Sequence, residues 1–154
     1  MRRSITLSLL LLCVGGAYSV RAVDGRVVKV LPHFLDLKGQ HTLSPSLYQR
    51  DAYQAYLRQH PEERSAIRFD VQWKVTDSKR AQHKLRVEIR GVAEGNLPKQ
   101  KVMEQSVKGG GWFSHWSSLP FSGGEYKQFG EVTAWRVTLW EGELLLAEQN
   151  SFLW

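Results

Sequence analysis

The stretch that decides the fold is AIRFDVQWKV, residues 66–75. Apolar side chains occupy every second position from Ile67 to Val75, and charged or polar side chains fill the positions between them. Successive side chains of a β-strand point to opposite faces of the sheet. This period of two therefore predicts a strand with one buried and one exposed face.

Further strands are predicted on both sides of this one. The same alternation recurs in residues 85–90 and 132–140, and more weakly in 101–107. The remaining predicted strands are an edge strand at 26–31 ending at Pro32, an aromatic strand at 112–119, and a final strand at 143–154 with a bulge at 144–146. Connections rich in glycine or polar residues are predicted at 76–84, 91–98, 109–111 and 120–130, the last with one helical turn at 125–129.

One helix is predicted in the N-terminal third of the chain, over residues 47–59. Ser44 or Ser46 can act as its N-cap, and Pro61 lies just beyond its end. Four residues are predicted to share one face of this helix, Tyr48, Ala52, Ala55 and Tyr56. Because a helix of about 13 residues is marginal alone in water, we expect it to dock on the sheet.

Short strands separated by glycine and proline turns predict a mainly β fold, a two-sheet sandwich with one short docked helix. Residues 23–154 are enough for a single domain. Cys13 is the only cysteine of the chain, so this domain has no disulfide and must be stabilised by packing.

Residues 66–154 resemble an immunoglobulin or fibronectin type III sandwich. The order of elements carries the resemblance: a strand with an inward Trp73, a turn before residues 132–140, and a closing hairpin. The segments GQHTLSPSL (39–47) and SFLW (151–154) are also similar to stretches of exported bacterial proteins of unknown function. The first resemblance implies a sandwich fold, and neither implies an activity.

Residues 1–22 have the features of a secretory signal peptide. Arg2 and Arg3 precede an apolar run at 5–14, and Val20-Arg21-Ala22 offers small residues at the positions that signal peptidase reads. We expect cleavage after Ala22, with 15–17 as a second site and an uncleaved anchor as the alternative. The expected route is Sec export to the periplasm or the cell exterior. The apolar run has about half the roughly 20 residues that span a bilayer, so no stable membrane span is expected after cleavage.

Removal of this segment takes away Arg2, Arg3 and Arg21, which lowers the formal net charge from +6 to +3. A charge of this size is ordinary for a small soluble domain. Together with export, it argues against a nucleic-acid partner.

No catalytic or metal-binding motif is evident. His33 and His41 flank a turn-rich segment that contains Asp36, but the spacing matches no metal motif. Ser122 and the pair Ser114-His115 are the nearest candidates for a nucleophile, yet adjacent residues of a strand point to opposite faces. We therefore expect neither a cofactor nor an enzymatic activity.

Aromatic side chains are the strongest candidates for a binding surface. The candidate residues are Trp112, Trp116, Trp140, Tyr48, Tyr53 and Tyr56. Trp112 and Trp116 would share one face of the predicted strand 112–119, although burial under the helix or in the core competes with this interpretation. An edge strand, either 26–31 or the last one, could also recruit a partner by strand addition.

Two functions remain open from these residues. The first is a non-catalytic protein-interaction or structural module of the cell envelope. The second is a carbohydrate-binding domain, because flat exposed aromatic side chains stack on sugar rings and anchor partners. The expected partner is thus a protein or a glycan of the envelope.

Overall fold

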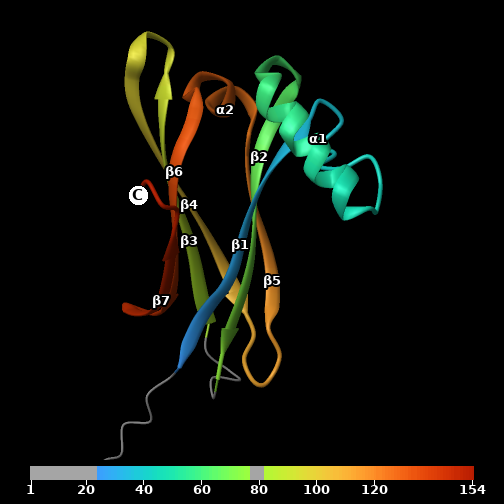
Figure 1. Cartoon of the computed structure of the whole chain (residues 1–154). Helices are drawn as coiled ribbons and strands as arrows, with labels where there is room; N and C mark the ends of the chain where they lie inside the picture. The colour runs from blue at the N-terminus through green and yellow to red at the C-terminus, as the bar shows by residue number, and fades with distance from the viewer. Residues whose placement is uncertain (1–23, 77–81) are drawn as a thin grey trace, which may run out of the picture.

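The computed structural model describes residues 24–76 and 82–154 (Figure 1). The expected signal peptide, with Cys13, lies outside the described residues. The described chain forms two antiparallel sheets packed face to face, which confirms the predicted sandwich. The first sheet has the order β1 (Gly25–Asp36), β2 (Arg64–Val75), β5 (His115–Ser122). The second has the order β4 (Leu97–Lys108), β3 (Gln82–Ala93), β6 (Glu131–Glu141), β7 (Leu144–Asn150).

The core lies between the two sheets and follows the alternation of β2. Its largest buried side chains from this strand are Phe69 and Trp73, and both are essentially inaccessible to solvent. Apolar side chains of β3 and β6 face them from the other sheet, namely Leu85, Val87, Ile89, Val137 and Leu139. Trp135 packs against this core and meets Phe69 edge-to-face at 6.4 Å. The predicted inward face of 132–140 is therefore confirmed.

Three prolines lie inside strands whose bounds the sequence placed wrongly, two ended too early and one begun too late. β1 continues past Pro32 to Asp36, β4 already begins at Leu97 and includes Pro98, and β5 continues through Pro120 to Ser122. All three strands are sheet edges. A proline lacks the N–H of a sheet hydrogen bond, and an edge strand has one side on which that donor is not needed. The expected strand ends at Pro32 and before Pro120 are therefore wrong. The expected connection at 91–98 is shorter in the structure, because β3 extends to Ala93 and β4 begins at Leu97.

The last strand has the predicted bulge but is shorter than expected. Leu139 pairs with Ala147 whereas Trp140 pairs with Leu145, so Leu146 is the extra residue. β7 ends at Asn150, and the segment after it folds back on the sheet. There Trp154 lies against the guanidinium groups of Arg90 and Arg136, at 3.9 and 4.8 Å from the ring centroid.

Helix α1 (Leu47–Gln59) has the predicted bounds, but it docks through a different face. Its buried residues are Gln54 and Leu57, whereas Tyr48 of the predicted face is 83% exposed. Oε1 of Gln54 accepts the N–H of Phe34 at 2.8 Å, and its Nε2 donates to the Phe34 carbonyl at 2.9 Å. A side-chain amide thereby takes the place of a neighbouring strand at the edge of β1. This contact covers part of the edge that strand addition would need.

Replacing Gln54 by alanine should destabilise the domain by about 1–3 kcal/mol, because it leaves partly buried backbone groups of Phe34 in β1 without this partner. Chemical denaturation of the variant measures this change. Gln49→Ala is the control, since Gln49 is exposed on the same helix. Equal midpoints for the two variants would show that Gln54 does not hold the helix to the edge.

Arg64 joins the C-terminal end of α1 to both sheets. Its guanidinium donates to the carbonyls of Leu57 and Arg58 in the last helical turn, and to the carboxylate of Glu131 at the start of β6. The same group lies over the ring of Phe34, 4.1 Å from its centroid. A cation at this position satisfies helix carbonyls that have no partner within the helix.

Helix α2 (Gly123–Phe129) closes the end of the sandwich near the C-terminal end of α1 (Figure 1). It contains the helical turn predicted at 125–129 and begins two residues earlier. Tyr126 and Phe129 are buried against Phe121, with ring planes nearly perpendicular to it. The opposite end of the sandwich carries the connection between β4 and β5.

Candidate functional site

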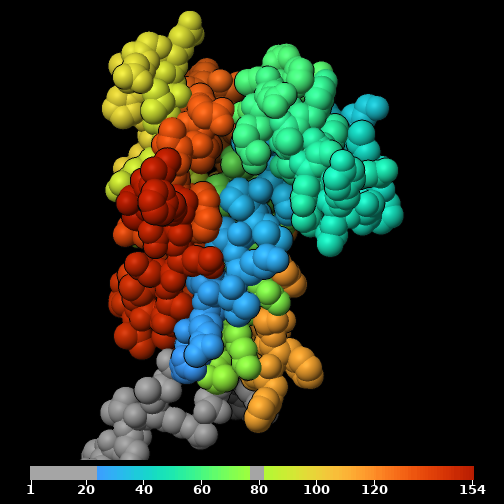
Figure 2. Space-filling model, in the orientation of Figure 1, coloured from blue at the N-terminus to red at the C-terminus, as the bar shows by residue number. Residues whose placement is uncertain are grey.

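The connection between β4 and β5 exposes an aromatic surface at one end of the sandwich. Trp112 is 90% exposed, Phe113 83% and Trp116 52%. We call these three residues the aromatic tip. The segment stands out from the body of the domain in the space-filling view, at the lower right (Figure 2). Neither the helix nor the core covers these side chains, so the competing interpretation, burial under the helix or in the core, does not hold for Trp112 and Trp116.

Trp112 and Trp116 do not share a strand face, as the sequence had predicted. β5 begins only at His115, and Trp112 lies in the turn before it. Trp116 pairs with Gln72 of β2 and lies on the outer face of the first sheet. The two indoles therefore belong to different parts of the tip, one at the turn and one on the sheet.

The base of the aromatic tip is held by several contacts to β2. The N–H of Gly111 donates to the carbonyl of Val75 at 2.9 Å. The indole N–H of Trp73 donates to Ser117, and the amide of Gln72 donates to Ser114. These bonds fix both ends of the turn, so Trp112 and Phe113 project from a supported base.

Two histidines, His83 and His115, flank Trp73 beneath the tip. The rings of His115 and His83 lie 5.1 and 6.0 Å from the ring of Trp73, and His83 is buried. Nε2 of His83 lies 3.0 Å from a carboxylate oxygen of Glu141. A Cβ on Gly109 would come within 2.9 Å of both His115 and Trp73, so glycine is required for this packing. In the sequence, the places of the two histidines on the inward face at the ends of β3 and β5 were the only sign of this packing.

Trp140 does not join the other two tryptophans. It lies in β6 on the outer face of the second sheet, where its indole N–H donates to Thr138 at 2.8 Å. It is half-buried and pairs with Lys84 of β3 and Leu145 of β7. The prediction of a surface that contains Trp112, Trp116 and Trp140 together is therefore wrong.

The three tyrosines of α1 have separate roles. The hydroxyl of Tyr53 donates to Asp36 at 2.7 Å, and that of Tyr56 donates to Glu63. Burial and this bond to Asp36 raise the pKa of Tyr53 to about 12. Tyr48 is exposed without such a contact. The structure thus uses Tyr53 and Tyr56 to join the helix to its neighbours, and they do not form one free surface with Tyr48.

The histidine cluster considered from sequence is organised around Asp70. His33 and Arg68 both donate to Oδ2 of this carboxylate, and Ser118 donates to Oδ1. Burial opposes ionisation of Asp70, but these three hydrogen bonds hold its pKa well below the usual range. The ring of His41 lies 5.0 Å from that of His33, and the two ring planes are tilted by 38°.

Asp36 turns away from this cluster and accepts the backbone N–H groups of Lys38 and Gln40. Within residues 24–76 and 82–154, no group of three histidine, cysteine or acidic side chains is placed to hold a metal ion. Ser122 lies at the N-cap of α2, and its side chain makes no cap hydrogen bond there. Ser114 binds Gln72 whereas His115 faces Trp73, so the adjacent pair is split as predicted.

The free energy of unfolding should fall as the pH drops from 7.5 towards 5.5, in part through His41. Burial, and then the positive charge of Arg68, lowers the pKa of this imidazole below 6.5. The unfolded chain therefore binds a proton at a higher pH than the folded protein does, and stability is lost on acidification. Urea midpoints at the two pH values measure the loss. It should be smaller in His41→Gln and unchanged in Tyr48→Phe; the same loss in both variants would contradict the assignment.

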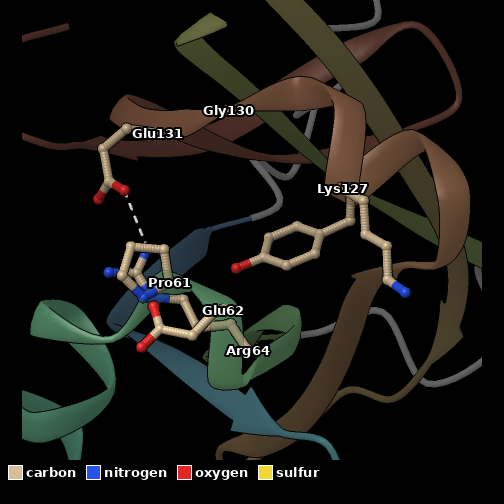
Figure 3. A pocket seen from close by; sticks show the side chains of 7 residues that line it. Pro61, Glu62, Arg64, Lys127, Gly130 and Glu131 are labelled. Atoms are coloured by element: carbon tan, nitrogen blue, oxygen red, sulfur yellow. Dashed lines mark hydrogen bonds and ion pairs between the residues drawn. The ribbon is translucent and has the colours of Figure 1, made fainter. Parts of the chain in front are cut away.

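A cavity of about 510 Å³ lies at the other end of the sandwich, between α2 and the turn after α1 (Figure 3). Arg64, Glu131 and the ring of Tyr126 line it, together with Pro61, Glu62, Lys127 and Gly130. The Arg64 guanidinium is already occupied by two helix carbonyls and by Glu131. Arg64 and Glu131 thus join the C-terminal end of α1 to the start of β6.

The fold and the exposed residues define a β-sandwich domain with an aromatic tip at one end. No known protein family matches the chain, and neither the curated proteins nor the solved structures yield a match. None of the helices in the described part of the chain is long and apolar enough to cross a membrane.

Proposed function

We propose that this chain is an exported, non-catalytic interaction module of the cell envelope and that the aromatic tip is its contact element. The observation that carries the proposal is the near-complete exposure of Trp112 and Phe113 on a supported turn. Burying such a side chain against a partner is favourable by about 1.5–3 kcal/mol, so contact at the tip can contribute to binding. Tryptophan is also enriched among the residues that dominate binding interfaces.

The strand order supports the proposed likeness to immunoglobulin domains. The first, second and fifth strands share one sheet, and the third, sixth and seventh share the other, as do strands ABE and CFG of those domains. The aromatic tip lies at the end where β2 leads to β3 and β6 leads to β7. The corresponding end of variable immunoglobulin domains carries recognition loops.

The proposed export rests on residues 1–22, whose charged start, short apolar run and small residues are those of a secretory signal. We assign the mature domain to the periplasm or the cell exterior. N-terminal sequencing of the protein recovered from a cell that expresses the full chain tests this. A mature start at Val23 is expected, and retention of Met1 in a cytoplasmic pool would contradict it.

Site-specific photo-crosslinking tests the contact role of the tip. A crosslinking amino acid is placed at Phe113, and at Phe152 as the matched control, because both phenylalanines are highly exposed. Incubation with the native envelope fraction should give a discrete adduct from position 113 and none from position 152. Equal adducts from both positions, or none from position 113, would count against the tip as the contact element.

Carbohydrate binding is the second candidate, and the surroundings of Trp116 favour it. This half-exposed indole lies beside Gln72 on the outer face of a three-stranded sheet. Ser118 and Asp70 form the next cross-strand pair on the same face, so hydrogen-bonding groups adjoin an aromatic side chain. A glycan screen should then show binding that Trp116→Ala removes and Trp140→Ala leaves intact. A blank screen with the folded protein ends this alternative.

A further inference from the structure

We infer that the aromatic tip docks on an anionic lipid surface, with Trp112 and Phe113 entering the headgroup region. This inference rests on the proposed contact role of the tip and names its partner. The two side chains are 90% and 83% exposed at a turn that protrudes from the domain (Figure 2). A protruding pair of rings suits a soft, flat partner better than a small ligand that must be enclosed. Tryptophan in particular prefers the boundary between lipid and water.

Other apolar side chains lie at the same end of the sandwich. Leu144 and Leu145 open β7 and are 58% and 43% exposed. The pairing of His83 with Glu141 places the turn between β6 and β7 beside the start of β3, close to the base of the tip. A surface that meets Trp112 and Phe113 thus has further apolar contacts within reach.

Basic side chains accompany the apolar ones. Arg26 of β1 pairs directly with Lys74 of β2, and Lys108 ends β4 just before the tip. Among the residues that the structure describes, the carboxylates at this end are Asp24, Glu141 and Glu143, and Glu141 is engaged by His83. Lysine and arginine beside exposed aromatic side chains favour binding to anionic lipid headgroups.

The chain also enters the domain at this end. The carbonyl of Asp24 accepts the N–H of Thr76 at 2.9 Å, and the carbonyl of the preceding residue, Val75, accepts the N–H of Gly111. The described N-terminal end of the domain, at Asp24, therefore lies beside the base of the aromatic tip.

Vesicle co-sedimentation tests the inference with the protein purified from expressing cells. The vesicles contain phosphatidylglycerol and phosphatidylethanolamine, and phosphatidylcholine vesicles serve for comparison. Two double variants are compared, W112S/F113S at the tip and F152S/L153S at the C-terminus, where the side chains are also highly exposed. Any N-terminal segment that remains is the same in both proteins. Partitioning into anionic vesicles should fall at least tenfold in W112S/F113S, stay at the wild-type value in F152S/L153S, and weaken with added salt.

Absence of wild-type binding to anionic vesicles, or equal binding by both double variants, would overturn the inference. Binding to the native envelope then separates it from the proposed function. If W112S/F113S loses binding to the envelope while pure lipid vesicles never bind the wild type, the tip is a contact element for another partner and only the lipid inference fails. If envelope binding is also insensitive to W112S/F113S, both fail.

Discussion

Gly130→Ala is expected to destabilise the domain by about 3 kcal/mol or more, the largest effect of an alanine substitution at any glycine of the described residues. Gly130 joins α2 to β6 with φ 84° and ψ −148°, a backbone conformation that residues with a side chain rarely adopt. A Cβ at this position would lie 2.1 Å from the carbonyl oxygen of Val92 and 2.6 Å from Cα of Ala93. Both are backbone atoms of β3, which cannot move aside without breaking the strand pairs.

Gly124→Ala is the matched control for this substitution. Gly124 lies in α2, its φ is not positive, and a Cβ there would meet no atom within 4 Å. Alanine should therefore be neutral or stabilise the domain by up to about 1 kcal/mol. Guanidinium unfolding curves of the two variants measure the difference. Similar midpoints would mean that the close approach of α2 to β3 is wrong.

Trp73→Ala should lower the free energy of unfolding by about 3–5 kcal/mol, because it removes the largest fully buried side chain of the core and leaves a cavity there. The indole also donates to Ser117 and packs between His83 and His115, so its loss should loosen the base of the aromatic tip. Faster hydrogen exchange in residues 109–117 should accompany the lower stability. Trp73→Phe keeps an aromatic ring and should lie between the two extremes.

Trp112→Ala makes the same chemical change at a 90% exposed position and serves as the control. Its free energy of unfolding should stay within about 0.5 kcal/mol of the wild type, as is usual for surface substitutions. Thermal or chemical unfolding compares the two variants. Equal destabilisation by both would contradict the division of tryptophans into a core and a tip.

Much of the fold was predictable from local patterns. The alternation in 66–75 and 132–140 identified the central strands, and Ser46 and Pro61 set the bounds of α1. Errors at strand ends came from prolines, which end central strands but are tolerated at sheet edges. A single sequence cannot distinguish an edge from a central strand before the sheets are assembled.

The docking face of α1 was not predictable, because a polar residue carries it. Hydrophobic spacing favoured Tyr48 and Tyr56, whereas the buried contact is made by the amide of Gln54 with the backbone of β1. Its value depends on an unpaired strand edge that only the tertiary structure creates. The Asp70 cluster depends in the same way on strands far apart in the chain.

The candidate site was predicted in part. Trp112 and Trp116 were selected from composition, but their placement on one strand face was wrong because the turn after β4 extends to Ser114. Aromatic residues occur both in cores and on surfaces, so whether one is exposed depends on its position in the folded sheets and turns, not on its residue type. Trp73 and Trp112 illustrate the two outcomes.

Binding of the purified protein to the native envelope fraction tests the central claim most directly. The wild type is compared with W112S/F113S and with F152S/L153S, and the affinity is measured at low salt. We predict at least a tenfold loss of affinity for W112S/F113S, since two exposed aromatic anchors are removed, and no change for F152S/L153S. Equal affinity of all three proteins would contradict the assignment of the aromatic tip as the contact element.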